Sequence, residues 1–97
     1  MKVFMLSFMS ASNAITRQKV QEFLDTRREV LNWFGAMPST IIIVSNVDVL
    51  NLSQPLRDHF GADFTFIISE IDPTKTDGFI NKKVWDFINF PKASGRW

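Results

Sequence analysis

The chain of 97 residues contains no cysteine. This absence excludes a disulfide framework, a cysteine-based zinc site and a thiol nucleophile, and it fits a reducing compartment. We therefore expect a cytoplasmic protein that carries no cofactor. Any catalysis would have to use oxygen or nitrogen groups, or a metal ion held by carboxylates.

Histidine is almost absent as well, since His59 is the only one in the sequence. One histidine cannot form a histidine pair for a metal or for an acid–base relay within one chain, and a Ser-His-Asp triad would depend on it alone. The sequence places His59 near the end of a helix. We interpret it as a helix-end side chain that interacts with the helix dipole, rather than as a catalytic group.

Long apolar runs are also missing, because no stretch approaches the roughly 20 apolar residues of a membrane span. The N-terminal segment 1–9 has the apolar character of a signal peptide, but it is short and no small-residue cleavage motif follows it. We expect it to form a strand in a soluble protein that does not associate with membranes.

Neither charge sign dominates, with 11 Lys+Arg against 10 Asp+Glu and a formal net charge of +1. This balance lies well short of the strongly basic composition typical of proteins that bind nucleic acid by overall charge. The hydrophobic fraction of 45% with 22% charged residues is that of a globular domain. We expect one domain over residues 1–90 and a loose C-terminal tail over residues 91–97.

The hydrophobic periodicity predicts an α+β protein. Ser12 or Asn13 is expected to cap the first helix, and Pro55 to lie in the first turn of a second helix capped by Asn51 or Ser53. The expected elements are strands at 2–8, 30–34, 40–45 and 63–71, a hairpin loop at 35–39, and helices at 14–27, 51–60 and 80–89. This order predicts a ferredoxin-like βαββαβ antiparallel sheet, in strand order 4-1-3-2, with an extra C-terminal helix.

The strands lack the polar residues that normally mark a solvent-facing side. In segment 2–8 apolar residues occupy both alternating sets, and segment 40–45 repeats this pattern. Two helices cover only one face of such a sheet. The other face is covered either by the C-terminal helix or by a second subunit, and we favour a homodimer because contiguous exposed apolar patches usually mark an interface.

Candidate functional residues fall into three groups. Glu70 and Asp72 lie two apart, so on a strand they would share a face, as a carboxylate pair for a divalent metal or as solubilising end-of-strand charges. The candidates for contacts with nucleic acid are Arg17, Arg27, Arg28, Lys82 and Lys83, although acidic neighbours favour a solvated mixed-charge surface. The candidates for a protein interface are Trp33, Phe34, Trp85 and the terminal Trp97, with ordinary burial as the alternative.

Several segments together resemble a known family. They are Trp33 followed by 37–44, the segments 51–53 and 66–71, and Gly78-Phe79 with Trp85. The chain resembles the small SinR-like ferredoxin-like proteins, which are similar in fold to the smaller subunit of CRISPR adaptation complexes and to VapD-type ribonucleases. The resemblance implies this fold and dimerisation through the sheet.

For nuclease members the resemblance implies an acidic residue just after the first strand, which dimerisation would bring together with its copy around a divalent metal. This sequence has Phe8-Met9-Ser10 there, and no Asp or Glu precedes Glu22. We therefore expect no catalytic residue at this position. The sequence favours a non-catalytic homodimeric module that binds another protein, and the alternative is a small metal-dependent endoribonuclease or nucleic-acid-binding protein.

Overall fold

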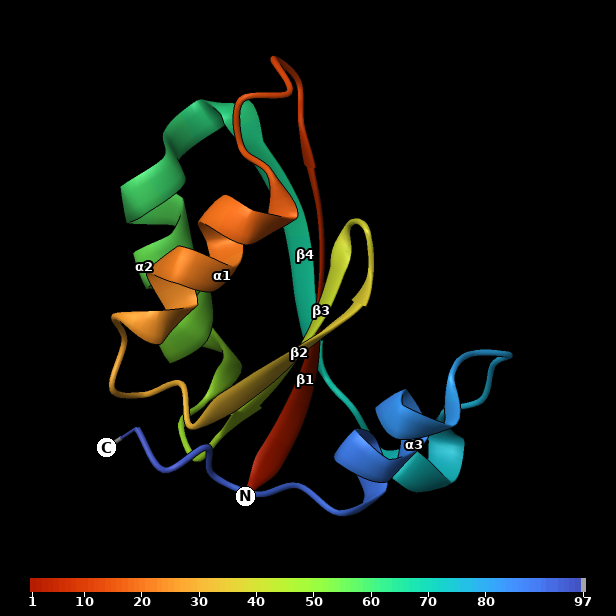
Figure 1. Ribbon diagram of the computed structural model, residues 1–97. Coiled ribbons are helices and arrows are strands. Elements are labelled where there is room, and N and C mark those ends of the chain that lie inside the picture. Colours follow the sequence, from red (N-terminus) through yellow and green to blue (C-terminus); the bar gives the residue numbers. More distant parts are fainter. Residues whose placement is uncertain (97) are drawn as a thin grey trace.

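A computed structural model describes residues 1–96 and shows one four-stranded antiparallel sheet with α-helices on both of its faces (Figure 1). The expected α+β class is confirmed. The strand order is β2-β3-β1-β4, which is β4-β1-β3-β2 when read from the other edge. The elements are β1 (Lys2–Ser10), α1 (Arg17–Asp25), β2 (Asn32–Met37), β3 (Thr40–Ser45), α2 (Val49–Phe60), β4 (Phe64–Glu70) and α3 (Lys82–Asn89), with short 3-10 helices at Gly61–Asp63 and Pro73–Lys75.

Strand β1 lies at the centre and pairs along most of its length with both β3 and β4. Phe4, for example, lies opposite Ile43 on one side and Glu70 on the other. Because side chains alternate across a strand, the even-numbered residues of β1 point to one face of the sheet and the odd-numbered residues to the other. The register of β1 therefore decides which residues of every other strand share its two faces.

The first face carries the main hydrophobic core, beneath α1 and α2 (Figure 1). Phe4 and Leu6 from β1 are fully buried there, together with Leu24 from α1 and Leu56 from α2. Both helices place apolar residues at helical spacing toward the sheet, which is why they pack on it. The buried residues of this main core are Phe4, Leu6, Phe8, Val20, Leu24, Val30, Ile41, Ile43, Leu52, Leu56 and Phe64.

The second face carries a smaller core beneath α3, which lies at the end of the sheet where β1 begins (Figure 1). Val3 and Ile42 from the sheet are buried there against Val84 and Ile88 from α3. The C-terminal helix thus covers part of this face within the same chain, and the remaining part has no helix over it. Among residues 1–96 no helix is long and apolar enough to cross a membrane.

Helix α1 is shorter than the expected 14–27, and its cap is a different residue. Thr16 is the N-cap, and its side chain accepts a hydrogen bond from the backbone N–H of Lys19. Asn13 has a φ of 60°, in the left-handed region, so the chain there turns instead of starting a helix. The turn after β1 therefore delays the helix to Arg17.

Strand β2 is longer than the expected strand at 30–34, and the hairpin loop at 35–39 is wrong. The strand continues to Met37 through an irregularity of register between Gly35 and Met37, and only Pro38 and Ser39 form the turn. A Cβ atom at position 35 would lie 2.7 Å from Nε2 of Gln21, so the lack of a side chain at Gly35 leaves room for Gln21. The glycine marks a close approach of α1 to the strand rather than a loop.

Helix α2 starts earlier than expected, at Val49, with Asp48 as its N-cap. Val49 packs against the main core, so burial draws the start of the helix upstream of Asn51 and Ser53. Pro55 consequently lies inside the helix and not in its first turn. A proline there cannot donate the backbone hydrogen bond that the carbonyl of Asn51 would otherwise accept.

The C-terminal tail, expected to be loose, is held against β2 as far as Arg96. The backbone N–H of Ser94 donates to the carbonyl of Leu31 over 2.8 Å, and the side chain of Asn32 donates to the carbonyl of Lys92. Arg96 forms an ion pair of 3.1 Å with Asp25. These contacts hold the tail beside the edge of the sheet. Hydrophobic periodicity does not predict them.

The two cores predict different costs for the same truncation. We expect Ile43→Ala to lower the free energy of unfolding by about 4 kcal/mol and Ile88→Ala by about 2 kcal/mol. Ile43 lies in the larger core on the central part of the sheet, whereas the short helix around Ile88 can move inward to fill the space. Urea denaturation of both variants measures the difference, and equal losses would contradict it.

Candidate interaction surface

The part of the second sheet face that α3 leaves uncovered carries exposed apolar side chains. Met5 is 40% exposed, Met9 64%, Met37 47% and Ile67 70%. The registers place them on this face, since Ser7 of β1 lies opposite Ile67 of β4 and opposite Thr40 of β3, whose partner in β2 is Met37. We call the surface formed by Met5, Met9, Met37 and Ile67 the open half-face.

No strand contributes a charged side chain to the open half-face. The only charged residues in the four strands are Lys2 and Glu70, and their even-numbered register places both on the opposite face. Hydroxyl side chains of Ser7, Thr65 and Ser69 lie between the apolar groups. The open half-face therefore offers no Lys or Arg to a phosphate backbone, and it presents exposed apolar groups instead.

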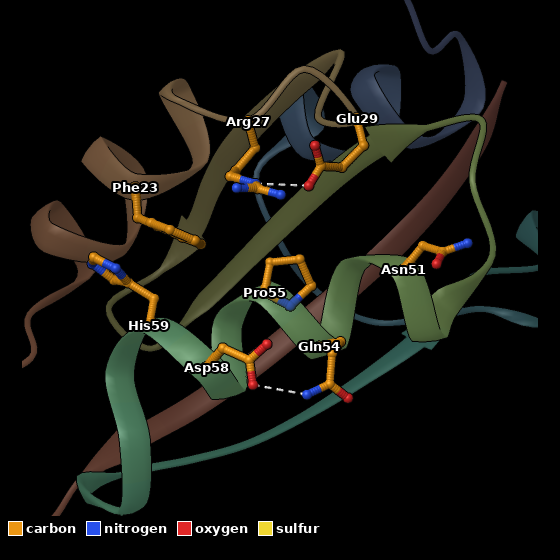
Figure 2. A pocket seen from close by; sticks show the side chains of 8 residues that line it. All are labelled: Phe23, Arg27, Glu29, Asn51, Gln54, Pro55, Asp58 and His59. Carbon is orange, nitrogen blue, oxygen red and sulfur yellow. Dashed lines mark hydrogen bonds and ion pairs between the residues drawn. The ribbon is translucent and has the colours of Figure 1, made fainter.

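A hollow of about 670 Å³ lies on the other side of the molecule, between α1 and α2 (Figure 2). It is lined by Phe23, Arg27, Glu29, Asn51, Gln54, Pro55, Asp58 and His59. Figure 2 shows Phe23 and His59 turned toward one another, and their rings are stacked with centroids 4.2 Å apart. His59 lies in the last turn of α2, as the sequence predicted.

Four polar side chains of this hollow form two pairs. Nε2 of Gln54 donates to Oδ1 of Asp58 over 2.8 Å, and Nε of Arg27 donates to Oε1 of Glu29 over 2.8 Å. The His59 side chain stacks on Phe23 and forms no hydrogen bond with another residue of segment 1–96.

The two candidate carboxylates do not share a strand, because β4 ends at Glu70. Asp72 instead caps the short 3-10 helix that follows, and its Oδ1 accepts hydrogen bonds from the backbone N–H and the hydroxyl of Thr74. Pro73 terminates the strand, which is why the expected shared face is lost. Within residues 1–96 no group of three or more His, Cys, Asp or Glu side chains is placed to hold a metal ion.

The candidate basic residues lie on opposite sides of the sheet. Arg17 belongs to α1, with Arg27 and Arg28 just after it, whereas Lys82 and Lys83 belong to α3. Three of them are engaged locally: Arg17 donates to the carbonyl of Met37, Arg27 pairs with Glu29, and Lys82 pairs with Asp86. The fold therefore does not combine the two groups into one basic groove.

The candidate interface aromatics are half-buried within the chain. Nε1 of Trp33 donates to Oδ1 of Asp25 over 2.7 Å, and the Phe34 ring lies 5.5 Å from that of Phe87. Trp85 packs beside the second core, and Trp97 lies outside the described residues. The open half-face is formed instead by Met5, Met9, Met37 and Ile67, and β1 places Met5 and Met9 on one face with Val3.

Asp63 joins the end of β1 to the start of β4. Its carboxylate accepts hydrogen bonds from the hydroxyls of Ser10 and Ser12, over 2.7 and 2.6 Å, and from the backbone N–H of Ser12. The hydrogen bond from the Ser12 hydroxyl, followed by that from Ser10, lowers the pKa of Asp63 below its ordinary value of 3.8. The sequence predicted only a helix-capping role for Ser12 and did not indicate this distant carboxylate, because nothing in the sequence links the two segments.

Comparisons with protein-family models, with curated proteins and with solved structures found no match to this chain. The open half-face is therefore interpreted from its own chemistry.

The pKa of Asp63 predicts how stability depends on pH. Because its folded pKa is lowered, its contribution is fully present above the unfolded pKa of about 4 and is lost as pH falls through the folded pKa. Asp63→Asn should therefore be less stable than wild type at pH 7 and lose less stability between pH 5 and pH 2. Urea midpoints across this range measure the effect.

Asp77→Asn is the matched control, since the Asp77 side chain is exposed and forms no hydrogen bond or ion pair within residues 1–96. Its profile should follow that of wild type. Parallel profiles for Asp63→Asn and wild type would contradict the role given to Asp63.

Proposed function

We propose that this protein is a non-catalytic, homodimeric binding module that docks on an apolar surface of another protein through the open half-face. The observation that supports the proposal most directly is the uncharged, uncovered part of the sheet, where Met9 and Ile67 are 64% and 70% exposed. Large exposed apolar groups that gather on one surface commonly mark a site of interaction with another molecule. Methionine also adapts its shape to a partner surface.

We include a ferredoxin-like fold and the SinR-like family in this proposal. The order βαββαβ, the central position of β1 and the packing of α1 and α2 on one face support the fold. The proposed dimerisation agrees with what the family resemblance implies. A module of this kind contributes a rigid sheet rather than a reacting group.

The nuclease alternative has less support in the geometry. The resemblance implies an acidic residue just after the first strand, where this chain has Ser10. The carboxylate nearest in space belongs to Asp63, and hydrogen bonds from Ser10 and Ser12 occupy it. A divalent metal would have to displace these bonds before it could bind.

The binding proposal predicts that charge on the open half-face abolishes partner binding. The tagged protein is used to capture host proteins, and each recovered protein is then purified and titrated against wild type and the Met9→Lys, Met37→Lys double variant. We expect at least a roughly tenfold weaker affinity for the double variant, because two Lys side chains would be desolvated in an apolar contact.

Phe90→Lys provides the matched control, because Phe90 is 71% exposed but lies just after α3 and outside the open half-face. Its affinity for the same partner should equal that of wild type. Equal binding by all three proteins would refute docking through the open half-face.

The non-catalytic part of the proposal is tested with labelled RNA and DNA, with and without Mg²⁺. We expect that wild type, Glu70→Gln and Asp72→Asn do not differ in cleavage of either nucleic acid. Metal-dependent cleavage that either substitution abolishes would establish the nuclease alternative instead.

A further inference from the structure

The two edges of the sheet differ in how their backbone groups are covered. The outer edge of β2 is bordered by the C-terminal tail, which donates from Ser94 to the carbonyl of Leu31, and by α1, from which Arg17 donates to the carbonyl of Met37. Gln21 also lies close above Gly35 in the middle of this strand. Natural proteins often cover an edge in this way to prevent strand addition.

The outer edge of β4 has no such cover. The hydrogen bonds from Ile71 N–H to Val3, and from Ala11 N–H to Asp63, show that odd-numbered residues on this side of the sheet bond toward β1. The backbone groups of Phe66, Ile68 and Glu70 therefore point away from the sheet. No hydrogen bond to them is found within residues 1–96, where β1 is the only strand beside β4.

Strand β4 also lacks the residues that usually protect an edge. Its sequence FTFIISE contains no lysine and no proline, and its aromatic and β-branched residues favour strand pairing. Beside it, between β4 and α2, runs a groove of about 660 Å³ to which Leu50, Phe66 and Ile68 contribute apolar side chains. The edge thus offers both unpaired backbone groups and apolar surface to an added strand.

We propose that a second copy of this chain occupies this edge, with the two β4 strands pairing antiparallel about a two-fold axis at Ile67. This register sets every residue of the strand opposite a residue of its copy, while the backbone N–H of Phe64 keeps its bond to the carbonyl of Gly61. Phe66 would exchange both main-chain hydrogen bonds with Ile68 of the partner subunit, and the two side chains would lie together on the groove side. On the other face the highly exposed Ile67 would lie opposite Ile67 of the partner subunit.

Charge complementarity selects a second copy over an unrelated strand. Arg57 lies one turn before Gly61 on α2 and lines the groove at the Phe64 end of β4, whereas Glu70 ends the strand roughly 20 Å away. Both side chains are exposed, and neither forms a hydrogen bond or ion pair within the described residues 1–96. The two-fold axis would bring Glu70 of each copy opposite Phe64 of the other, beside Arg57 of the partner subunit.

This inference rests on the proposed homodimer and specifies its interface. Edge pairing makes one continuous sheet of two copies, so their open half-faces lie side by side on the same surface. The helices α1 and α2 remain together on the opposite surface. The dimer is therefore compatible with docking of a third, different protein on the joined half-faces.

A charge exchange tests the interface with the full chain. Arg57→Glu and Glu70→Arg each replace two attractive pairs by two repulsive ones, and should raise the dimer dissociation constant roughly tenfold at low ionic strength. An equimolar mixture of the two variants restores opposite charges at both contacts. Sedimentation equilibrium should show the mixture dimerising within about threefold of the wild-type affinity.

Lys19→Glu and Asp77→Arg are the controls for a general charge effect, because both residues are exposed and lie away from β4. Each should dimerise like wild type. Weakening by both test variants with recovery in their mixture supports edge pairing, whereas weakening without recovery overturns it.

Two other results overturn the interface and separate it from the proposed function. A wild-type dimer that Met9→Lys disrupts, and that neither Arg57→Glu nor Glu70→Arg weakens, would leave the homodimer in place but move it to the open half-face. If the wild-type protein stays monomeric at all concentrations, both the homodimer and the edge interface are refuted. The comparison of wild type with the Met9→Lys, Met37→Lys double variant still tests partner binding in that case.

Discussion

The position of β1 at the centre of the sheet is the constraint on which the rest of the structure depends. Both of its edges are hydrogen-bonded, to β3 and to β4, and both of its faces carry apolar side chains. A strand of this kind must be covered twice. Helices α1 and α2 cover the first face of β1, whereas α3 covers only part of its second face. The exposed methionines and Ile67 are the apolar side chains on the second face that α3 leaves uncovered.

The periodicity of the strands and helices was enough to predict the α+β class, because apolar residues at strand and helix spacing decide local structure. The two-sided burial of β1 was also readable, since Val3 and Met5 are as apolar as Phe4 and Leu6. Element ends were less predictable, because they depend on distant contacts. Gly35 reads as a loop until the approach of Gln21 explains it, and Val49 joins α2 because the core buries it.

The candidate residues show the same division. Glu70 and Asp72 are close in sequence, but Pro73 separates their roles into a strand end and a cap. The contact of Asp63 with Ser10 and Ser12 joins segments about fifty positions apart, which no local pattern could reveal. Neither arrangement was therefore readable, because the first depends on where the strand ends and the second on which strands pair.

The C-terminal tail has a consequence for the geometry of assembly. An edge of a sheet accepts one added strand, so a molecule with a single bare edge forms a closed pair and then stops growing. A molecule with two bare edges can add copies at both ends without limit. The bonds of Lys92 and Ser94 to Asn32 and Leu31 flank the start of β2, whereas the outer edge of β4 has no such neighbour within residues 1–96. In the proposed edge-paired dimer, this difference between the two edges would limit strand pairing to two copies.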